Sequence, residues 1–335
     1  MKKTMTRYAL AGDIGGTKTI LGLFSFNGSK IKFLKVERFL NIEHQSIEDV
    51  IGMFLKGAGL TIASACFGVA SPVHEGACTL TNMDWRIDAE KIKKRFSIKK
   101  AALINDLVAT GYGIRFLVKK NLYVLNKGVK RRGNAVIISA GTGLGEAILF
   151  WNGSGHIPLD SEGGHADFAP RTDIEIELLN FLRKRLKHVS CERVLSGPGL
   201  ENIYRFLLDR SKKPMTQAIK GMFAALGPAP AISKEALIGK DKLCADALRL
   251  FVSIYGAEAG NLALKAMAAG GVYIGGGIAP GILNAMKGKI FLDSFKDKGR
   301  FSEFMSRIPV YVILNDRAAL YGAARQACLM LLIDS

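Results

Sequence analysis

Tyr8-Ala-Leu-Ala-Gly-Asp-Ile-Gly-Gly-Thr-Lys-Thr-Ile-Leu-Gly-Leu-Phe-Ser-Phe26 is the stretch that decides the fold of this 335-residue chain. Two apolar segments flank Gly15-Gly16, a pattern typical of a β-hairpin. The pattern recurs over 135–151, where an apolar segment leads into Gly141-Thr-Gly-Leu-Gly145 and a second apolar segment follows. Two such hairpins, each followed by a mixture of strand-like and helix-like segments, predict two related α/β halves.

The remaining segments fit that α/β pattern. Apolar runs predict strands at 31–39, 61–69, 101–104, 271–274 and 310–314. Apolar residues on one helical face predict helices at 46–57, 88–96, 107–117, 173–187, 199–209, 242–268 and 316–333. The segment 211–230 is expected to be a loop-rich connector.

The composition indicates a globular protein, because a 49% hydrophobic fraction is too high for a disordered chain. Five cysteines, an odd number without a Cys-x-x-Cys pair, argue against a disulfide framework and against a cysteine zinc site. No stretch reaches 18 uninterrupted apolar residues, and the N-terminal lysines precede no adequate apolar core for a signal peptide. We therefore expect a soluble cytoplasmic protein with no membrane partner.

The formal net charge of +18 would attract polyanions at long range. The basic residues are scattered in small clusters, however, and form no long basic tail. A basic surface on a soluble protein is therefore the favoured interpretation, and we expect no nucleic-acid partner.

The first glycine turn combines a carboxylate, two glycines and a hydroxyl in Asp13, Gly15, Gly16 and Thr17. Glycines permit a tight turn and leave backbone N–H groups open to a phosphate. A carboxylate beside a phosphate makes sense if a Mg²⁺ lies between them, directly or through water. The spacing is not that of a P-loop, because Thr17 precedes Lys18, and an ordinary hairpin turn is the alternative.

Two further glycine turns have the same character. Gly141-Thr142-Gly143 offers bare backbone and a hydroxyl, in a hairpin and not in the strand–turn–helix of a dinucleotide fingerprint. Gly275-Gly276-Gly277 follows an expected strand and makes a flat surface suited to a nucleotide. Each alone could be a simple turn, but three such turns in one chain favour a phosphate ligand.

Polar residues follow the expected strand at 101–104. Asp106 is ionised near neutral pH, so it can accept the proton of a sugar hydroxyl that attacks phosphorus. Asn105 and Asp106 lie where ligand groups belong in an α/β sheet, at a strand end, although both residue types also favour a helix N-cap. Asn82 precedes Trp85, an amide–aromatic combination common at sugar sites, and a capped turn is its alternative.

Three more polar side chains are candidates for binding sugar hydroxyls. Glu162 and His165 could bind vicinal hydroxyls, because a carboxylate accepts hydrogen bonds while neutral histidine both donates and accepts. The two glycines between them argue against a helix and thus against a Glu-x-x-His metal site; a plain polar loop is the other alternative. Glu192 precedes a glycine turn and could equally be a surface carboxylate.

Together these motifs resemble the bacterial glucokinase family, within the superfamily of actin-like ATPases and sugar kinases. The resemblance covers about residues 8–327, and its eight ordered motifs are specific only in combination. They are Gly12-Asp-Ile-Gly-Gly-Thr-Lys18, Gly68-Val-Ala-Ser-Pro72, Leu80-Thr-Asn-Met-Asp-Trp85, Ile104-Asn-Asp-Leu107, Ser139-Ala-Gly-Thr-Gly-Leu-Gly145, Glu162-Gly-Gly-His-Ala-Asp-Phe168, Glu192-Arg-Val-Leu-Ser-Gly-Pro-Gly-Leu200 and Gly275-Gly-Gly277.

The resemblance implies a two-domain actin-like ATPase (ribonuclease H-like) α/β fold with an interdomain cleft, and ATP-dependent phosphorylation of the glucose 6-hydroxyl. The small domain would comprise 1–110 and 316–335, and the large domain 111–315. The resemblance implies Asp106 as general base, Mg²⁺ near Asp13 and a homodimer as a family expectation. The implied glucose ligands are Asn82, Asn105, Asp106, Glu162, His165 and Glu192; the implied ATP ligands are Asp13, Gly15, Gly16, Thr17, Gly141, Thr142, Gly143, Gly275, Gly276 and Gly277.

The chain departs from the family pattern at Lys18, where the family often has Asn and where the related repressor and kinase group has Lys. That group usually carries a cysteine-rich zinc motif, which this sequence lacks, as it lacks an N-terminal helix-turn-helix extension. Three alternatives stay open: a kinase for another hexose, a sugar-responsive DNA-binding regulator, and an actin-like filament protein.

Overall fold

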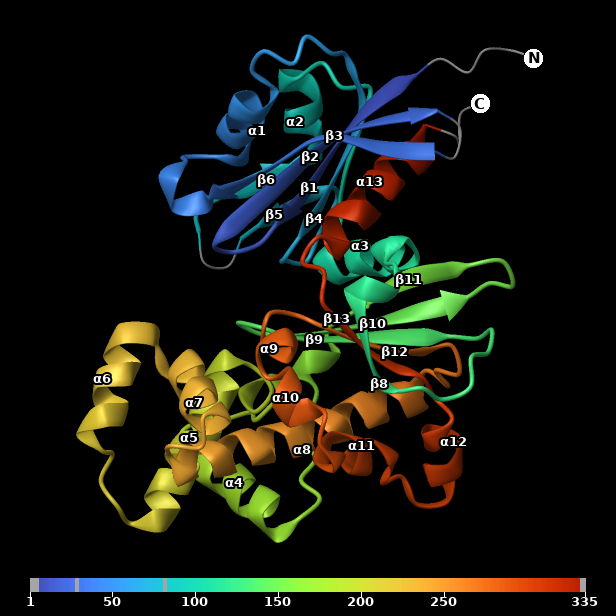
Figure 1. Ribbon diagram of the computed structural model, residues 1–335. Coiled ribbons are helices and arrows are strands. Elements are labelled where there is room, and N and C mark those ends of the chain that lie inside the picture. Colours follow the sequence, from blue (N-terminus) through green and yellow to red (C-terminus); the bar gives the residue numbers. More distant parts are fainter. Residues whose placement is uncertain (1–5, 28–29, 81–82, 332–335) are drawn as a thin grey trace. The chain divides into compact units, whose positions relative to one another are not determined.

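The computed structural model describes residues 6–27, 30–80 and 83–331 (Figure 1). They form two compact units, one of residues 1–118 and 315–335 and the other of residues 119–314, taken over the whole chain. The sequence predicts a small domain of residues 1–110 and 316–335 and a large domain of residues 111–315, with boundaries close to those of the two units. Among the described residues, no helix is both long and apolar enough to cross a membrane.

The first unit is built on a five-stranded sheet in the order β3-β2-β1-β4-β7. β1 is antiparallel to β2 and parallel to β4, and β4 is parallel to β7. The strands are β1 (Arg7–Ile14), β2 (Lys18–Asn27), β3 (Lys30–Leu40), β4 (Ile62–Val69) and β7 (Lys100–Asn105), with a separate ribbon of β5 (Ala77–Thr79) and β6 (Arg86–Asp88). The helices are α1 (Ile47–Leu55), α2 (Ala89–Arg95), α3 (Asp106–Gly113) and α13 (Ala318–Met330).

Alternation along β1 gives this sheet two apolar faces. Leu10 and Ile14 belong to the core that includes residues of α1 and α2, whereas Ala9 and Ala11 belong to the core that includes residues of α13. Successive side chains of a strand point to opposite faces, so both faces need a helical cover. The predicted hairpin at 8–26 therefore lies at the centre of a three-layer arrangement within this unit.

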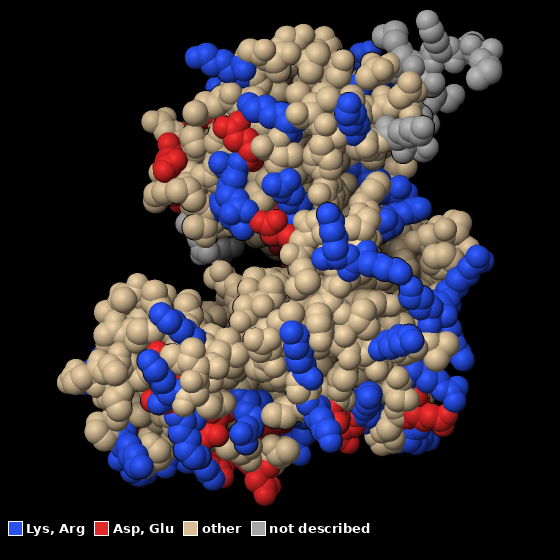
Figure 2. All heavy atoms as spheres, viewed as in Figure 1, with Lys and Arg blue, Asp and Glu red and all other residues tan. Residues whose placement is uncertain are grey.

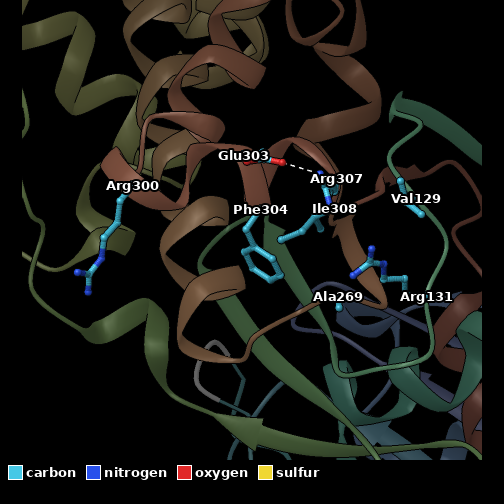
Figure 3. Close-up of a pocket in the computed structure, with 8 residues that line it drawn as sticks. All are labelled: Val129, Arg131, Ala269, Arg300, Glu303, Phe304, Arg307 and Ile308. Carbon is cyan, nitrogen blue, oxygen red and sulfur yellow. Dashed lines mark hydrogen bonds and ion pairs between the residues drawn. The ribbon is translucent and has the colours of Figure 1, made fainter.

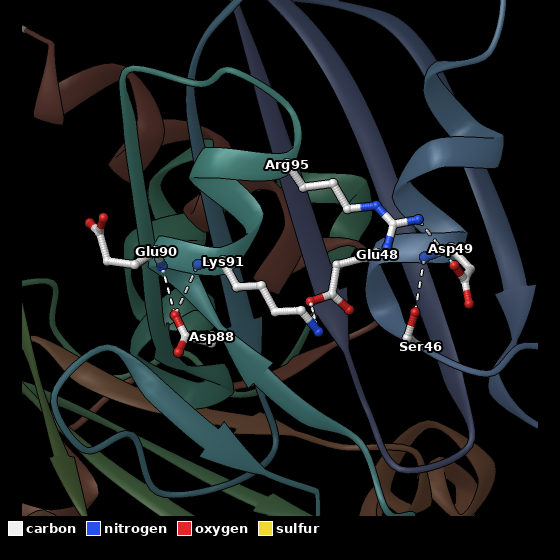
Figure 4. A network of polar contacts seen from close by, with 7 residues as sticks. All are labelled: Ser46, Glu48, Asp49, Asp88, Glu90, Lys91 and Arg95. Carbon is white, nitrogen blue, oxygen red and sulfur yellow. Dashed lines mark hydrogen bonds and ion pairs between the residues drawn. The ribbon is translucent and has the colours of Figure 1, made fainter.

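Helices α1 and α2 are capped and joined by polar contacts (Figure 4). Ser46 accepts a hydrogen bond from the N–H of Asp49, and Asp88 caps α2 in the same way. Between the helices, Lys91 Nζ lies 3.0 Å from Oε1 of Glu48, whose side chain is only 1% exposed. Arg95 adds a second ion pair, with Asp49. The buried carboxylate thus has a cation that reaches it from the neighbouring helix.

The second unit contains a six-stranded sheet in the order β11-β10-β9-β12-β13-β8. Its first part repeats the antiparallel β3-β2-β1 arrangement, and β9, β12 and β13 then run parallel. This repeat is the structural counterpart of the two predicted hairpins. The strands are β8 (Leu122–Asn126), β9 (Ala135–Ala140), β10 (Leu144–Trp151), β11 (His156–Ser161), β12 (Gly271–Gly275) and β13 (Val310–Ile313).

The helices of the second unit share one large apolar core with this sheet. The longest, α8 (Lys242–Lys265), packs against α5, α7 and α11. The described helices are α4 (Asp173–Arg183), α5 (Gly197–Ser211), α6 (Gln217–Leu226), α7 (Pro228–Leu237), α8, α9 (Ile278–Gly281), α10 (Leu283–Met286), α11 (Lys289–Lys296) and α12 (Ser302–Ser306).

The expectation of a loop-rich connector over 211–230 is wrong, because this segment contains α6 and the start of α7. Gly227 and Pro228 suggested a break in regular structure. Pro228 instead occupies the first position of α7, where no N–H donor is needed, and Gly227 has a φ of 80° that joins the two helices. Thr216 caps α6 by accepting a hydrogen bond from Ile219 N–H.

Candidate active site

The β1–β2 turn is the first predicted phosphate loop. Gly15 N–H donates to the carbonyl of Lys18 at 3.0 Å and closes the turn, while Thr17 and Lys18 are exposed. Asp13, half-buried, ends the loop on the β1 side. The structure thus brings Asp13, Gly15, Gly16 and Thr17 together, as the sequence predicted.

A buried amide, missed by sequence reasoning, supports this turn. Asn41 Nδ2 donates to the carbonyl of Gly15 at 2.8 Å, and its backbone N–H donates to Thr17 at 3.0 Å. Its Oδ1 accepts a hydrogen bond from the buried Thr19 hydroxyl at 2.8 Å. Asn41 follows β3 without any motif of its own, so only the pairing of β2 with β3 brings it here.

The parallel strands bring the first turn and the predicted base to one edge of the sheet. Ile14 pairs with Val69, and Val69 pairs with Asn105, so Asp13 and Asp106 lie at the same carboxyl ends. This is where open α/β sheets bind their ligands.

Asp13 is electrostatically coupled to two other acids of this unit. Burial and the charge of Asp106 raise the pKa of Asp13 to about 7, against the opposing effect of Lys18. Asp316, which the sequence reasoning did not single out, also raises this pKa and forms an ion pair with Arg38 at 2.6 Å. Accumulated negative charge of this kind favours the binding of a cation.

The N-cap alternative holds for Asn105. Its Oδ1 accepts hydrogen bonds from the N–H groups of Leu107 at 2.8 Å and Val108 at 3.3 Å. Asp106 opens α3, is half-buried, and accepts a hydrogen bond from Leu107 N–H through Oδ1. The cap therefore fixes the backbone from which the Asp106 carboxylate projects.

The second predicted phosphate loop joins β9 to β10. Gly141 N–H donates to the carbonyl of Gly143 at 2.8 Å, and Gly197 N–H donates to the carbonyl of Gly141 at 2.8 Å. Thr142 at the tip is exposed. These hydrogen bonds therefore fix the shape of the loop and leave the Thr142 hydroxyl exposed.

Glu192 lies against this loop, a contact that the sequence did not indicate. Its Oε2 accepts a hydrogen bond from Leu144 N–H at 3.0 Å, and a Cβ added to Gly143 would be 2.5 Å from the same oxygen. The carboxylate predicted to bind sugar thus also supports the phosphate loop.

Glu162 and His165 lie together on a single 3₁₀ turn, Gly163–His165. Their carboxylate and imidazole are 3.8 Å apart and mostly exposed. The turn is pressed onto β10, because a Cβ added to Gly164 would overlap the carbonyl of Leu144. Within this unit, the turn of Glu162 and His165 is therefore adjacent to the second phosphate loop.

The third glycine turn lies beside the second. Gly275 pairs with Ser139 of β9, and a Cβ added to Gly276 would overlap the carbonyl of Ala140. Gly276 has a φ of 80°, which also favours glycine, and both Gly276 and Gly277 are exposed. Gly275, Gly276 and Gly277 thus extend the bare backbone surface of Gly141-Thr142-Gly143.

The predicted residues are divided between the two units. Asn82 lies outside the described residues.

A pocket of about 300 Å³ in the second unit is lined by Arg131, Arg300 and Arg307 together with Phe304 (Figure 3), and it contains none of the predicted residues. Among the described residues, no three His, Cys, Asp or Glu side chains form a metal-binding group.

Lysine and arginine side chains are scattered over the visible face of both units (Figure 2). This distribution agrees with the dispersed basic clusters in the sequence and with their interpretation as a generally basic surface.

Comparisons with known proteins agree on one family. The family model described as Glucokinase matches residues 10–330. The glucokinase of Nostoc sp. (strain PCC 7120) is 42% identical over 333 residues, covering 94% of this chain and 97% of its own, and that of Salmonella typhi is 36% identical over 320 residues, covering 95% and 96%. The crystal structure of a glucokinase from an Antarctic psychrotroph superposes with a TM-score of 0.82 at 30% identity, covering 97% of this chain and 99% of that one.

More distant solved structures share the fold. A ROK-family glucokinase from Streptomyces griseus, 21% identical, has a TM-score of 0.63 and covers 96% of this chain and 99% of its own. These neighbours have the two-domain actin-like ATPase fold, so the predicted fold class is confirmed.

Proposed function

Because the chain belongs to the glucokinase family, we propose that it transfers the terminal phosphoryl group of ATP to the 6-hydroxyl of glucose, giving glucose 6-phosphate and ADP. The observation that carries this proposal is the position of Asp106. It lies half-buried at the carboxyl ends of the parallel strands β1, β4 and β7, in the same unit as the glycine turn proposed to bind phosphate.

Asp106 is the general base of the proposed reaction. Its carboxylate would accept the proton of the 6-hydroxyl as that oxygen attacks the terminal phosphorus of ATP. The cap made by Asn105 and the first turn of α3 holds this carboxylate in place. Positioning accounts for much of the rate in phosphoryl transfer, so a fixed base is worth more than a mobile one.

The remaining predicted residues bind the two substrates. Backbone N–H groups and hydroxyls of the three glycine turns would hold the phosphates and the adenosine side of ATP. Glu162 and His165, which share one turn, would bind neighbouring hydroxyls of the sugar. Asn82, Asn105 and Glu192 are proposed to complete the sugar site. Glu192 would connect the sugar to the phosphate loop that it supports through Leu144.

Mg²⁺ fits the acidic residues around Asp13. Mg²⁺ in phosphate sites uses one or two carboxylates and keeps several waters, so a cluster of three protein ligands is not required. Asp13, whose pKa is raised by burial and by the charges of Asp106 and Asp316, would gain from a cation nearby. When bound, Mg²⁺ neutralises charge on the phosphates of ATP.

The test is a coupled assay of ADP release with glucose, mannose, fructose and N-acetylglucosamine, with and without Mg²⁺. Glucose should give the highest kcat/KM. Asp106→Asn should lower kcat by about 10²–10⁴-fold, the usual contribution of a general base, and should retain glucose binding. Asp293→Asn, an exposed acid on α11, is the control.

Near-normal turnover in Asp106→Asn would remove that residue from the base role. A higher kcat/KM for another hexose would make the enzyme a kinase for that sugar, and no turnover with any sugar would refute the activity. A shift of genomic DNA at about 150 mM salt would support the regulator alternative instead.

A cytoplasmic location and a homodimer are further proposals that rest on the family resemblance. Fractionation of cells and the molar mass in solution, measured by light scattering, test them.

A further inference from the structure

A buried carboxylate of β10 is unused by the proposed mechanism. Glu146 is 2% exposed, and its Oε1 is fully buried without a hydrogen-bond partner among the described residues. An unpaired buried oxygen is costly, and more so if it is charged. Such a group needs an explanation in the packing around it.

The packing ties Glu146 to the turn that carries Glu162 and His165. In the β10–β11 ladder, Glu146 is paired with Ser161, whose hydroxyl accepts a hydrogen bond from Gly163 N–H at 2.9 Å. A Cβ added to Gly163 would overlap Oε2 of Glu146. A side chain at position 163 would therefore have to displace the buried carboxyl group of Glu146, which fills the space beneath the turn.

The charges around Glu146 favour its neutral form. Burial and the charge of Glu258 together raise the pKa of Glu146 to about 7, against the opposing effect of Lys265. Lys265 Nζ is 3.9 Å from Glu258 and largely exposed. The other titratable neighbours are Cys191, whose pKa is raised by burial and by the charge of Glu258, and Tyr255, whose pKa is raised by burial; both stay neutral.

Protonation lowers the cost of burying this carboxyl, because a neutral group is less costly to desolvate than a charged one. A neutral carboxyl has an O–H donor, so it can face a second buried carboxylate without like-charge repulsion. Glu258 is such a carboxylate; its Oε2 already accepts a hydrogen bond from Asn261 at 2.9 Å. Protonation of Glu146 thus removes the like-charge repulsion between Glu146 and Glu258.

We propose that Glu146 is a positioning residue whose neutral, buried carboxyl supports the turn of Glu162 and His165, and so sets the affinity for the sugar. This inference rests on the proposed function, which assigns sugar binding to that turn. The carboxyl of Glu146 acts through the backbone of Gly163 and takes no part in phosphoryl transfer.

The test compares steady-state kinetics of the wild type, Glu146→Gln and Glu146→Ala with glucose and ATP varied in turn. Glu146→Ala should raise the glucose KM roughly tenfold and change kcat and the ATP KM by less than about twofold. Glu146→Gln keeps the shape and a donor, so it should stay within about twofold of the wild type at pH 6. Glu48→Ala is the matched control, since it removes a carboxylate that is 1% exposed in the other unit.

A pH profile separates positioning from simple loss of stability. Across a pKa of about 7 the neutral fraction falls about tenfold between pH 6 and pH 8, so the wild-type glucose KM should rise by up to that factor. Glu146→Gln should lack this rise. Gly163→Ala should raise the glucose KM, and the double variant with Glu146→Ala should recover part of the loss, because the overlap is gone.

An unchanged glucose KM in Glu146→Ala, or the same pH profile in the wild type and Glu146→Gln, would overturn the inference while leaving the proposed function intact. A wild type that phosphorylates no sugar would overturn both. If Glu146→Ala does not fold, the Glu146→Gln profile and the Gly163→Ala kinetics still decide.

Discussion

The amide of Asn41 offers a sharp test of how the first phosphate loop is held. Replacing it by leucine keeps the branching and the number of side-chain heavy atoms but removes the bond from Nδ2 to Gly15 and the bond that Oδ1 accepts from Thr19. Thr19 is fully buried, so its stranded hydroxyl finds no water partner and costs about 1–3 kcal/mol. Gly15 is half-buried, so the bond lost there costs only about 1 kcal/mol. We expect Asn41→Leu to lower the unfolding free energy by about 2–4 kcal/mol.

The loop should lose its shape together with this stability. Gly15 and Thr17 are both bonded to Asn41, so the backbone proposed to bind phosphate would be held by one bond where two were present. The ATP KM should rise about tenfold and the glucose KM by less than about twofold. Urea denaturation followed by circular dichroism, with kinetics on the same samples, measures both effects.

The control is the double variant Asn41→Leu with Thr19→Val. It removes the stranded hydroxyl, so it should regain about 1–2 kcal/mol relative to Asn41→Leu alone. An Asn41→Leu variant with the wild-type denaturation midpoint would refute the energetic reasoning. A destabilised variant with an unchanged ATP KM would refute the link from Asn41 to phosphate binding.

Three further substitutions should change the stability or the activity of the protein in a definite direction. The carboxyl of Glu146 has a pKa of about 7 in the native state against 4.5 in the unfolded chain. The native state therefore binds more protons between these values, and its stability falls as pH rises through them. Glu146→Gln should remove up to about 3 kcal/mol of that fall, measured as the difference in unfolding free energy between pH 5 and pH 8. Gly322→Ala would overlap the carbonyl of Ala109 where α13 crosses α3, and should lower the melting temperature and kcat together. Lys91→Met should cost about 1–2 kcal/mol in urea denaturation, because it strands the buried Glu48 carboxylate and Lys91 is itself largely exposed.

Local patterns were enough to predict most of the sheet framework. Apolar segments around Gly15-Gly16 and around 141–145 predicted both hairpins, because the signal for a strand pair lies within a few residues. The error over 211–230 has a local cause as well, since Pro228 is equally compatible with a turn and with the first residue of a helix.

The supports of the site could not be predicted, because they depend on distant contacts. Glu192 reaches Leu144 across 48 residues and Asn41 reaches Gly15 across 26. Neither contact produces a periodic pattern or a motif in the sequence. Glu146 in turn looks like an ordinary polar residue of an alternating strand until β11 places Gly163 against it.

The crossing of α13 over α3 has a consequence for how the chain is made. The apolar face formed by Ala9 and Phe24 shares its core with Leu320 and Ala323 of α13, which follow the whole 119–314 unit in the chain. The 119–314 unit can therefore complete its core on the ribosome while the earlier-made unit still lacks one layer. In a nascent chain that apolar sheet surface stays exposed until α13 has been synthesised, so a premature stop codon near residue 315 should give an aggregating, insoluble product.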